Sequence, residues 1–459
     1  MSDTDTTKNK YDVAVIGSGP AGGSIVSRAC QAGLKVAVID KRWGGTCAVY
    51  GCTPKKAMET ITELYYKAKL LQGFGWNDKP EPIDWPTLMR NKQQFTELTP
   101  MNTVIQFESQ GAACYEGEAE FVDAHTLQVG EETVTADNIV IATGARPRIP
   151  DVKGKEHLRV SDDFFELERL PRRVAFIGGG YVAFELSMIA RAAGREVTIL
   201  NDDKQPLSHF ESDHVAELCK FVVGQGIDLR LGYDVGRVDK QGDSYAIETT
   251  SYGGQSVTFE ADVVFATAGR IPNVDRIGMG KLGVELDDKG TPPLDDHLRV
   301  EGQPHIYVAG DAIGKLPFTP AAVYEAEVVG DNLIEDADHK VDHQAFAKVV
   351  HTLPALGAVG LLEREAREQD EDFEVYSGEL KGKFSHRRFH LDYGAYKILT
   401  DRKQRIIGAH FMGENAHELV NYFTLAMRHG LTVEQLKKTA YGYPTAGSEV
   451  STMLAEPDE

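Results

Sequence analysis

The stretch that decides the fold lies near the amino terminus, where residues 11–22 read YDVAVIGSGPAG. An apolar run, Val13 to Ile16, leads into three glycines spaced as GxGxxG, and a helix-forming segment follows them. A strand covered by helices on both faces is apolar along its whole length, so this run predicts a buried parallel strand. We therefore expect a strand, a glycine turn and a helix, which together begin a nucleotide-binding unit.

Each glycine of this turn has a physical role in such a unit. Gly17 would make the tight turn, Gly19 would let the backbone approach a pyrophosphate, and Gly22 would let helix and strand pack closely. The helix N-terminus would then face the phosphates, and Asp40, eighteen residues after Gly22, could accept a hydrogen bond from a ribose hydroxyl. An ordinary strand-to-helix turn is the alternative, and the acidic residue at this spacing counts against it.

The same unit occurs a second time, 161 residues further along the chain. Residues 173–183 read RVAFIGGGYVA, with Ala183 in place of the third glycine. The strands that follow also correspond, since GLKVAVID at 33–40 matches GREVTILN at 194–201. Two copies predict two dinucleotide-binding domains.

The end of the second copy bears on which nucleotide it would bind. Asn201 stands at the position of Asp40 and is followed by Asp202 and Asp203. An extra 2′-phosphate would favour an arginine here, and Lys204 is the only cation nearby. The sequence therefore favours NADH over NADPH.

Other apolar segments divide the rest of the chain. IVIATGARP at 139–147, VVFATAGRIPN at 263–273 and IYVAGD at 306–311 each indicate a buried strand that ends in small residues. The charged segment 151–171 is predicted to be a linker, because it is rich in polar residues and ends in a proline.

From about residue 340 the pattern changes. A hairpin is predicted at 396–411 and an amphipathic helix over 415–429. We predict an α/β fold with two Rossmann-like dinucleotide-binding domains and a C-terminal α+β dimerisation domain. The expected bounds are 1–150 with 276–339 for the first domain, 151–275 for the second and 340–459 for the third.

Composition limits the class of protein. The 459 residues suit roughly three domains of ~150 residues each. A net charge of −21 disfavours nucleic acid or an anionic membrane surface as a partner, because both need a basic face. No apolar run approaches the ~20 residues of a membrane helix, and the first ten residues, MSDTDTTKNK, do not resemble a signal peptide. We predict a cytoplasmic location.

Two of the five cysteines lie close together, in GGTCAVYGCTPKK at residues 44–56. Cys47 and Cys52 would be near enough to bridge if both lay on a helix, and a thiolate near a helix N-terminus and a lysine has a lowered pKa. Two structural cysteines or half a zinc site are the alternatives. The other three cysteines are isolated, so no second pair completes a zinc site, and we expect no metal centre.

In order along the chain, these motifs resemble the pyridine nucleotide-disulfide oxidoreductases, the family that includes glutathione reductase, dihydrolipoyl dehydrogenase and mercuric reductase. GxGxxG, GGTCxxxGCxPxK, ATG, GGGYxAxE, GRxPN and AGDA all occur in the family's order over essentially the whole length. The resemblance implies that the first repeat binds FAD, that the second binds NAD(P)H, and that the chain forms a homodimer.

The resemblance also implies roles for single residues. Cys52 would be the thiolate that faces the flavin, and Cys47 the thiol that attacks the substrate. Lys56 would lie near flavin N5, with Glu185 as the acid paired with it. The alternative for these last two is a surface cation and an ordinary helix carboxylate.

Further residues would bind the cofactors. Asp311 would hold the ribityl chain of FAD, Thr319 would lie beside the isoalloxazine, and Tyr181 would gate the nicotinamide pocket. The whole expected set is Gly17, Gly19, Gly22, Asp40, Gly45, Thr46, Thr143, Gly144, Gly178, Gly180, Tyr181, Asn201, Gly269, Arg270, Gly310, Asp311 and Thr319.

The chain departs from the family where a proton donor is expected. Family members that reduce disulfides carry a His-Pro-Thr segment with a Glu five residues after the His, supplied by the partner subunit. Here Tyr443 holds the His position, Ser448 the Glu position, and Glu449 comes one residue later. A phenol with a pKa of ~10 is a poor proton shuttle at neutral pH. This predicts weak reduction of glutathione disulfide or lipoamide.

Alternative roles for Tyr443 stay open. Mercuric reductases resemble this chain in the tyrosine, but they deliver metal from a C-terminal cysteine pair, and residues 451–459 contain no cysteine. Tyr443 could instead only pack the subunit interface. His351, His410 or His417 could in principle supply the proton.

The function expected is an FAD-dependent NAD(P)H oxidoreductase that passes electrons through Cys47 and Cys52 to a small disulfide, a metal ion or a quinone-type acceptor. Each active site of the homodimer would contain this pair from one chain and Tyr443 from the other. A dihydrolipoyl dehydrogenase or glutathione-reductase-like enzyme is the first alternative. A flavin-binding redox sensor with little turnover is the second.

Overall fold

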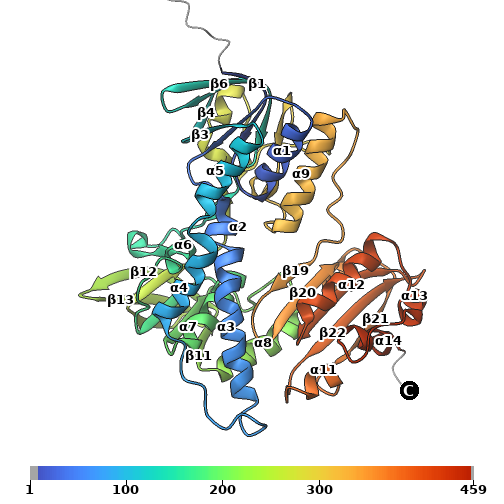
Figure 1. Ribbon diagram of the computed structural model, residues 1–459. Coiled ribbons are helices and arrows are strands. Elements are labelled where there is room, and N and C mark those ends of the chain that lie inside the picture. The colour runs from blue at the N-terminus through green and yellow to red at the C-terminus, as the bar shows by residue number, and fades with distance from the viewer. Residues whose placement is uncertain (1–8, 456–459) are drawn as a thin grey trace, which may run out of the picture. The chain divides into compact units, whose positions relative to one another are not determined.

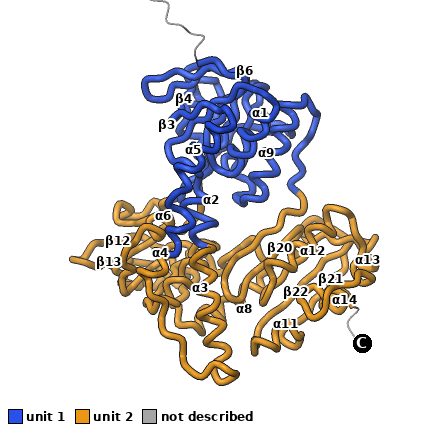
Figure 2. Tube along the Cα trace, in the orientation of Figure 1, with its two compact units in different colours: residues 1–55, 91–148, 270–343 blue, residues 56–90, 149–269, 344–459 orange. Residues whose placement is uncertain are grey.

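The computed structural model describes residues 9–455 and forms two compact units (Figures 1 and 2). Unit 1 takes its described residues from 1–55, 91–148 and 270–343, and unit 2 from 56–90, 149–269 and 344–459. Most of the amino-terminal segment used to argue against a signal peptide, and the last four residues of the cysteine-free carboxyl end, lie outside the described range.

Unit 1 is built on a mixed sheet with a parallel centre, and the first glycine turn follows its strand β1 (Figure 1). Strand β1 (Lys10–Ile16) lies at its centre, parallel to β2 (Val36–Asp40) and β6 (Glu132–Ile141). The other strands are β3 (Ala113–Glu116), β4 (Ala119–Asp123), β5 (Thr126–Val129), β17 (Arg299–Val300) and β18 (Gln303–Val308). A separate pair is formed by β7 (Ala145–Pro147) and β16 (Arg270–Pro272).

Helices of unit 1 cover the apolar strands. Helix α1 (Pro20–Gln31) packs beside α9 (Thr319–Ile334), and an Arg28 Nη1 donor reaches the Glu327 carbonyl at 2.9 Å. The remaining helices are α2 (Gly45–Val49) and α5 (Thr99–Ser109), while α3 (Cys52–Leu70) and α4 (Trp85–Thr96) run from one unit into the other. Val13 and Val15 are fully buried, as expected for a strand covered on both faces.

Unit 2 repeats this arrangement with the second glycine turn. Its five-stranded sheet is wholly parallel, and it consists of β8 (Arg159–Val160), β9 (Arg173–Ile177), β10 (Glu196–Asn201), β11 (Ile227–Leu231) and β15 (Val263–Ala266). Helices α6 (Ser161–Phe164), α7 (Tyr181–Ala192) and α8 (Ser212–Gly224) belong to it. An antiparallel sheet of β12 (Tyr233–Gln241), β13 (Ser244–Ser251) and β14 (Ser256–Ala261) adjoins it.

The linker predicted over 151–171 is partly wrong. Within it, Arg159 and Val160 form strand β8, which pairs with β15 at the sheet edge, and Ser161 begins helix α6. A two-residue strand is too short for a period-2 pattern, so its pairing comes from the neighbouring strand rather than from local sequence.

The C-terminal part of unit 2 is an antiparallel sheet in the order β19-β20-β23-β22-β21. Its strands are β19 (Lys348–Val350), β20 (Ala355–Gly360), β21 (Phe373–Glu379), β22 (Ala395–Asp401) and β23 (Ile406–Gly413), with helices α10 (Glu363–Glu368), α11 (Phe384–Arg387), α12 (Ala416–Arg428), α13 (Val433–Lys438) and α14 (Val450–Met453). Strands β22 and β23 confirm the predicted hairpin, and α12 confirms the amphipathic helix. The parallel strands of the two glycine-turn sheets and this C-terminal region confirm the predicted α/β class.

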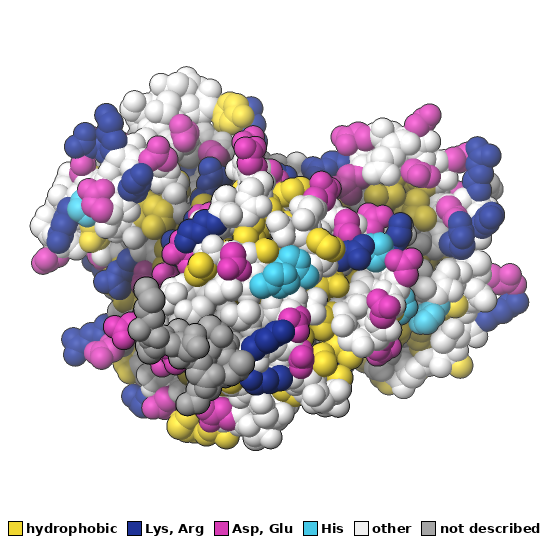
Figure 3. Space-filling model, turned by 90° about the horizontal axis from the view of Figure 1, so that it is seen from above, with side chains coloured by type: hydrophobic (Ala, Val, Ile, Leu, Met, Phe, Trp, Pro, Cys, Tyr) yellow, Lys and Arg dark blue, Asp and Glu magenta, His cyan; other side chains and the backbone are white. Residues whose placement is uncertain are grey.

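Two further features are the charges on the surface and the apolar character of the helices. Acidic and basic side chains lie interspersed on the face that Figure 3 shows. Between residues 9 and 455, no helix combines the length and apolar character that crossing a bilayer requires.

Candidate functional site

The first glycine turn has the shape of a phosphate-binding loop. Gly17 has φ +116°, and a Cβ built on it would lie 2.2 Å from the Ala142 carbonyl oxygen. A Cβ on Gly22 would lie 1.9 Å from the Gly17 oxygen, so a side chain at position 22 would push α1 away from the end of β1. Gly19 is the N-cap of α1 and has no side chain that could cap the helix. The first backbone N–H groups of α1 are therefore available to an anion.

The carboxylate of Asp40 is held at the end of β2 by this turn. Its Oδ2 accepts hydrogen bonds of 2.6 Å from both the backbone N–H and the hydroxyl of Ser18, and its Oδ1 accepts from the Arg42 N–H at 2.9 Å. The Ser18 Oγ in turn accepts from the Gly44 N–H at 2.9 Å. The nucleotide turn and the start of the cysteine segment are thus linked by hydrogen bonds.

The second copy reproduces the hydrogen bond between the glycine turn and the side chain at the end of the next strand. The Asn201 Oδ1 accepts from the Gly179 N–H at 2.7 Å, which is the counterpart of the Ser18 bond to Asp40. Gly178 has φ +108°, and Gly180 is the N-cap of α7, which begins with Tyr181. The repeat seen in the sequence is therefore a structural repeat.

Other predicted nucleotide residues of unit 1 leave polar groups suited to a bound cofactor. The Thr143 Oγ1 is buried and has no hydrogen-bond partner among residues 9–455. Burial raises the pKa of the Asp311 carboxyl, and the Arg270 guanidinium, whose Nε lies 3.9 Å from Oδ2, opposes that shift. An orphaned hydroxyl and a half-buried carboxylate are groups that a bound ligand with hydroxyls can satisfy, so the residues present fit FAD.

The remaining predicted residues lie beside the first glycine turn or just after other strands. A Cβ on Gly45 would meet the Gly19 Cα at 2.5 Å, and Thr46 lies in α2. Gly144 accepts through its carbonyl from the Asn273 N–H, while Gly269 and Gly310 have φ of +104° and +74°.

The structure does not place Cys47 and Cys52 on one helix, the arrangement for which we considered a bridge from the sequence. Cys47 belongs to α2, which ends at Val49, and Cys52 is the first residue of α3. Five residues of a continuous helix would rise about 7.5 Å, more than the ~7 Å that a disulfide tolerates between Cα atoms. Because the chain breaks between α2 and α3, the two cysteines are not held at this helical spacing. Gly51 lies at the break, where a Cβ would come within 3.0 Å of the Thr46 carbonyl oxygen.

The two cysteines meet a common hydroxyl from a distant helix. The Thr319 Oγ1, at the start of α9, lies 3.1 Å from the Cys47 Sγ and 3.5 Å from the Cys52 Sγ. The hydrogen bond to Cys52, and then burial, raise the pKa of the Cys47 thiol, while the Thr319 hydroxyl lowers it. Both cysteines are thiols in the structure. The geometry is that of a dithiol pair whose two sulfurs contact the same hydroxyl.

A second cluster lies within unit 2 and contains Lys56. Its ammonium donates to the Glu59 Oε2 at 2.5 Å and lies 3.4 Å from the His351 Nδ1. The backbone N–H of His351 donates to the Glu185 Oε1 at 2.7 Å. His351 thus connects the predicted pair Lys56 and Glu185, and Glu59 forms the ion pair. The sequence prediction missed Glu59, although its i,i+3 spacing from Lys56 on one helix could have indicated it.

The segment around Tyr443 is anchored by Glu449 and leaves Tyr443 exposed. Tyr443 has 83% of its surface accessible. The Glu449 carboxylate accepts from the Ser385 N–H at 3.0 Å and from the Ser385 hydroxyl at 2.7 Å. The same hydroxyl lies 2.9 Å from the Nδ1 of buried His386. Glu449 is therefore bound within its own chain.

Two of the three histidines considered as proton donors are poorly suited to that role. His410 is 1% exposed, and burial lowers its pKa to about 4. Burial also lowers the pKa of His417, and the charge of Lys56 adds to that effect. Imidazoles that stay neutral in this way carry no proton to give at neutral pH. His351 alone of the three contacts a predicted catalytic residue directly.

Comparison with known proteins agrees with this geometry. Residues 11–326 match the family described as pyridine nucleotide-disulphide oxidoreductase, and residues 346–454 match the dimerisation domain of that family. A glutathione reductase of Burkholderia cepacia is 31% identical over 450 residues, which cover 97% of this chain and 99% of that protein. A mercuric reductase of Staphylococcus aureus is 31% identical over 440 residues, covering 95% of this chain and 80% of that protein.

The matches extend over both glycine turns, the cysteine segment and the C-terminal sheet, and residues 327–345, which include the end of α9, lie between the two matched regions. They agree with two nucleotide-binding sheets and with a dithiol pair that follows the first of them. The chain therefore belongs to the pyridine nucleotide-disulphide oxidoreductase family and is an FAD-dependent NAD(P)H oxidoreductase.

Proposed function

We propose that the enzyme passes electrons from NADH through FAD and the Cys47–Cys52 pair to a small acceptor. The observation that carries this proposal is the contact of both sulfurs with one hydroxyl, that of Thr319. Two structural cysteines would not need a shared polar group, and a zinc site would need further ligands. A redox pair needs a donor that can stabilise whichever sulfur is ionised.

The cofactor sites follow from the two glycine turns. Gly17, Gly19 and the N-terminus of α1 would hold the FAD pyrophosphate, Asp40 a ribose hydroxyl, and Asp311 the ribityl chain. When bound, FAD would supply the two-electron chemistry that links the nicotinamide to the Cys47–Cys52 disulfide. The second turn, with Asn201 and two exposed aspartates after it, would hold NADH, because that acidic strand end repels a 2′-phosphate.

The dithiol can reduce a disulfide by exchange. The Cys47 sulfur, as thiolate, attacks one sulfur of the substrate and forms a mixed disulfide, and the other sulfur leaves and takes a proton. Cys52 then attacks Cys47, which releases the second thiol and restores the Cys47–Cys52 disulfide. The raised pKa of Cys47 keeps this sulfur protonated at neutral pH, so its deprotonation is part of the step.

We infer that acceptors without a thiolate leaving group are reduced better than disulfides. The exposed Tyr443 phenol would supply the proton in place of an imidazole, and Glu449, bound to Ser385, is not available to orient it. A metal ion or a quinone-type compound needs no such proton transfer to sulfur. The S. aureus relative is named mercuric reductase, which supports a metal ion as one acceptor.

Glutathione disulfide is a second candidate acceptor. The B. cepacia relative, named glutathione reductase, is matched over 99% of its length, which supports glutathione disulfide as an acceptor.

The match to the family's dimerisation domain supports a homodimer, in which residues 340–459 would form the interface and Tyr443 would act in the partner's site. The three-domain division and a cytoplasmic location stay predictions.

The test is NADH oxidation by the FAD-loaded protein with four acceptors: glutathione disulfide, lipoamide, a benzoquinone and mercuric ion. We expect turnover with the quinone or the metal to exceed that with either disulfide. Faster turnover with glutathione disulfide would favour the second candidate. Binding of FAD with no turnover on any acceptor would instead indicate the redox sensor.

A further inference from the structure

A pocket in unit 2 shares no residue with the proposed active site. It has a volume of about 320 Å³, within the range of small-molecule sites. It lies between the C-terminal half of α3, the segment 79–82 and the end of α7. The lining residues are Tyr65, Tyr66, Lys69, Lys79, Pro80, Glu81, Pro82, Arg191, Gly194 and Gln225.

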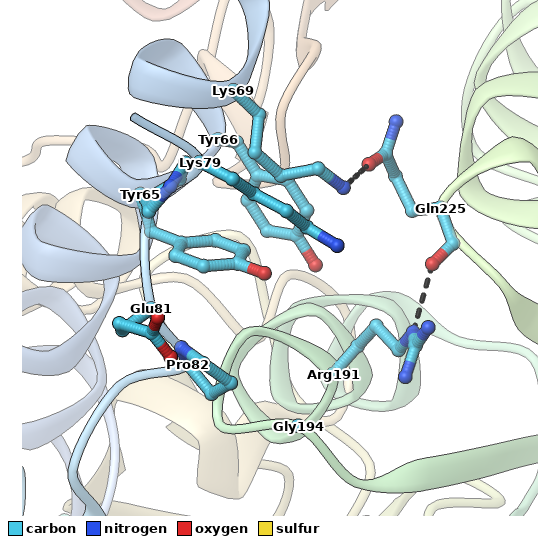
Figure 4. A pocket seen from close by; sticks show the side chains of 10 residues that line it. Tyr65, Tyr66, Lys69, Lys79, Glu81, Pro82, Arg191, Gly194 and Gln225 are labelled. Carbon is cyan, nitrogen blue, oxygen red and sulfur yellow. Dashed lines mark hydrogen bonds between the residues drawn. The ribbon is translucent and has the colours of Figure 1, made fainter. Parts of the chain in front are cut away.

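The pocket carries an excess of positive charge. Lys69, Lys79 and Arg191 all line it, and Glu81 is the one carboxylate in the lining. None of the three cations forms an ion pair with a carboxylate in the part of the chain that the structure describes. Figure 4 shows the two ammonium groups on one side of the pocket and the guanidinium on the other. Uncompensated cations around a cavity attract a bound anion.

Two of the three cations, Lys69 and Arg191, are held in place by neutral groups rather than by acids. The Lys69 ammonium donates to the Gln225 Oε1 at 2.7 Å, and the Arg191 Nε donates to the Gln225 carbonyl at 2.8 Å. The Arg191 Nη1 donates to the Arg195 carbonyl at 3.1 Å. Burial, and then the charges of Arg191 and Lys79, lower the pKa of Lys69. The cations therefore repel one another, and an anion between them would relieve that repulsion.

The rest of the lining is rigid and partly aromatic. The backbone N–H of Ile83 donates to the Ala192 carbonyl at 3.0 Å, which ties the segment 79–82 to α7. The rings of Tyr65 and Tyr66 meet edge to face at 5.3 Å. The Tyr66 hydroxyl donates to the Met188 carbonyl, whereas the Tyr65 hydroxyl has no hydrogen-bond partner among the described residues and faces the pocket (Figure 4).

We propose that this pocket binds a small anion that bears phosphate, held by Lys69, Lys79 and Arg191, with the Tyr65 hydroxyl as a further donor. A carboxylate binds best to two parallel N–H donors of an arginine guanidinium. In Arg191 one of those donors, Nε, already donates to the Gln225 carbonyl. Lysines act as point charges, and a tetrahedral phosphate accepts hydrogen bonds from several directions at once. Donors on opposite sides of the cavity suit that geometry.

The test is isothermal titration calorimetry of the FAD-loaded protein with inorganic pyrophosphate at constant ionic strength, with succinate as the carboxylate probe. We expect saturable binding of pyrophosphate and at least tenfold weaker binding of succinate. The double variant Lys69→Gln/Lys79→Gln should weaken pyrophosphate binding by tenfold or more. Glutamine at position 69 can still hydrogen-bond Gln225, so the fold is retained.

A matched control separates the pocket from general charge. Lys153 and Lys240 are exposed and do not line the pocket. The double variant Lys153→Gln/Lys240→Gln therefore removes two positive charges from unit 2, as the pocket variant does, and leaves the pocket unchanged. We expect this control to bind pyrophosphate as the unmodified protein does. Unchanged pyrophosphate binding by the pocket variant would place any binding elsewhere and overturn the proposal. Stronger binding of succinate would overturn the phosphate assignment.

Discussion

Replacing Thr319 by valine removes a hydroxyl that contacts both active-site cysteines, at 3.1 Å for Cys47 and 3.5 Å for Cys52. Valine has nearly the same shape, so the packing at the start of α9 is kept. A hydrogen bond to a charged group is worth about 1.5–3 kcal/mol, and partial exposure of the pair places the expected value at the low end. Since about 1.4 kcal/mol is a tenfold change in an equilibrium, the thiolate fraction of Cys47 should fall about tenfold.

The assay is the rate of alkylation of the reduced FAD-loaded protein by iodoacetamide at pH 8, with each modified cysteine identified by mass spectrometry. Thr319 lowers the pKa of Cys47, so its loss raises that pKa further and slows alkylation at any pH below it. The alkylation rate should fall more at Cys47 than at Cys52, because the Thr319 hydroxyl lies closer to the Cys47 sulfur. Thr319→Ser, which keeps the hydroxyl, should react as the unmodified protein does. Alkylation of the valine variant at the unmodified rate would refute the role given to Thr319.

Four further outcomes are expected. Cys52→Ser should bind FAD but lose the long-wavelength absorbance band that NADH produces in the unmodified protein, and a full band in the variant would reverse the roles of the two cysteines. Tyr443→His should raise disulfide turnover only a few-fold, well below the ~10²–10⁴ of a positioned general acid, because Glu449 is bonded to Ser385; a hundredfold gain in steady-state rate would contradict this. The kcat/KM for NADH should exceed that for NADPH, and the reverse order would show that the acidic strand end does not select the nucleotide. The melting temperature should fall between pH 6.5 and pH 4, because burial lowers the pKa of His386 to about 4 and the unfolded chain takes up this proton first; a flat profile over that range would count against it.

Much of the fold could be predicted from short stretches of sequence. The strands β1 and β9, the turns at Gly17 and Gly178, and the helices after them depend on residues close together in the chain. Their signals are local, because an apolar run, a glycine that must adopt positive φ and a helix each act over a few residues. The hairpin of β22 and β23 was predictable for the same reason. The spacing of Cys47 and Cys52 identified the pair, although not the break between α2 and α3 that allows the sulfurs to approach.

What only the tertiary structure decided are the contacts made across long separations in sequence. Thr319 meets Cys47 from 272 residues away, and His351 meets Lys56 from 295 residues away. The pairing of Glu449 with Ser385 and the cluster of cations around the pocket at α3 and α7 also depend on packing. No local pattern records such contacts, because they arise when the burial of apolar faces brings separate elements together. The sequence by itself determined which chemical groups the protein carries. The packing of its helices and sheets decided which of those groups form hydrogen bonds with one another and which line the same cavity.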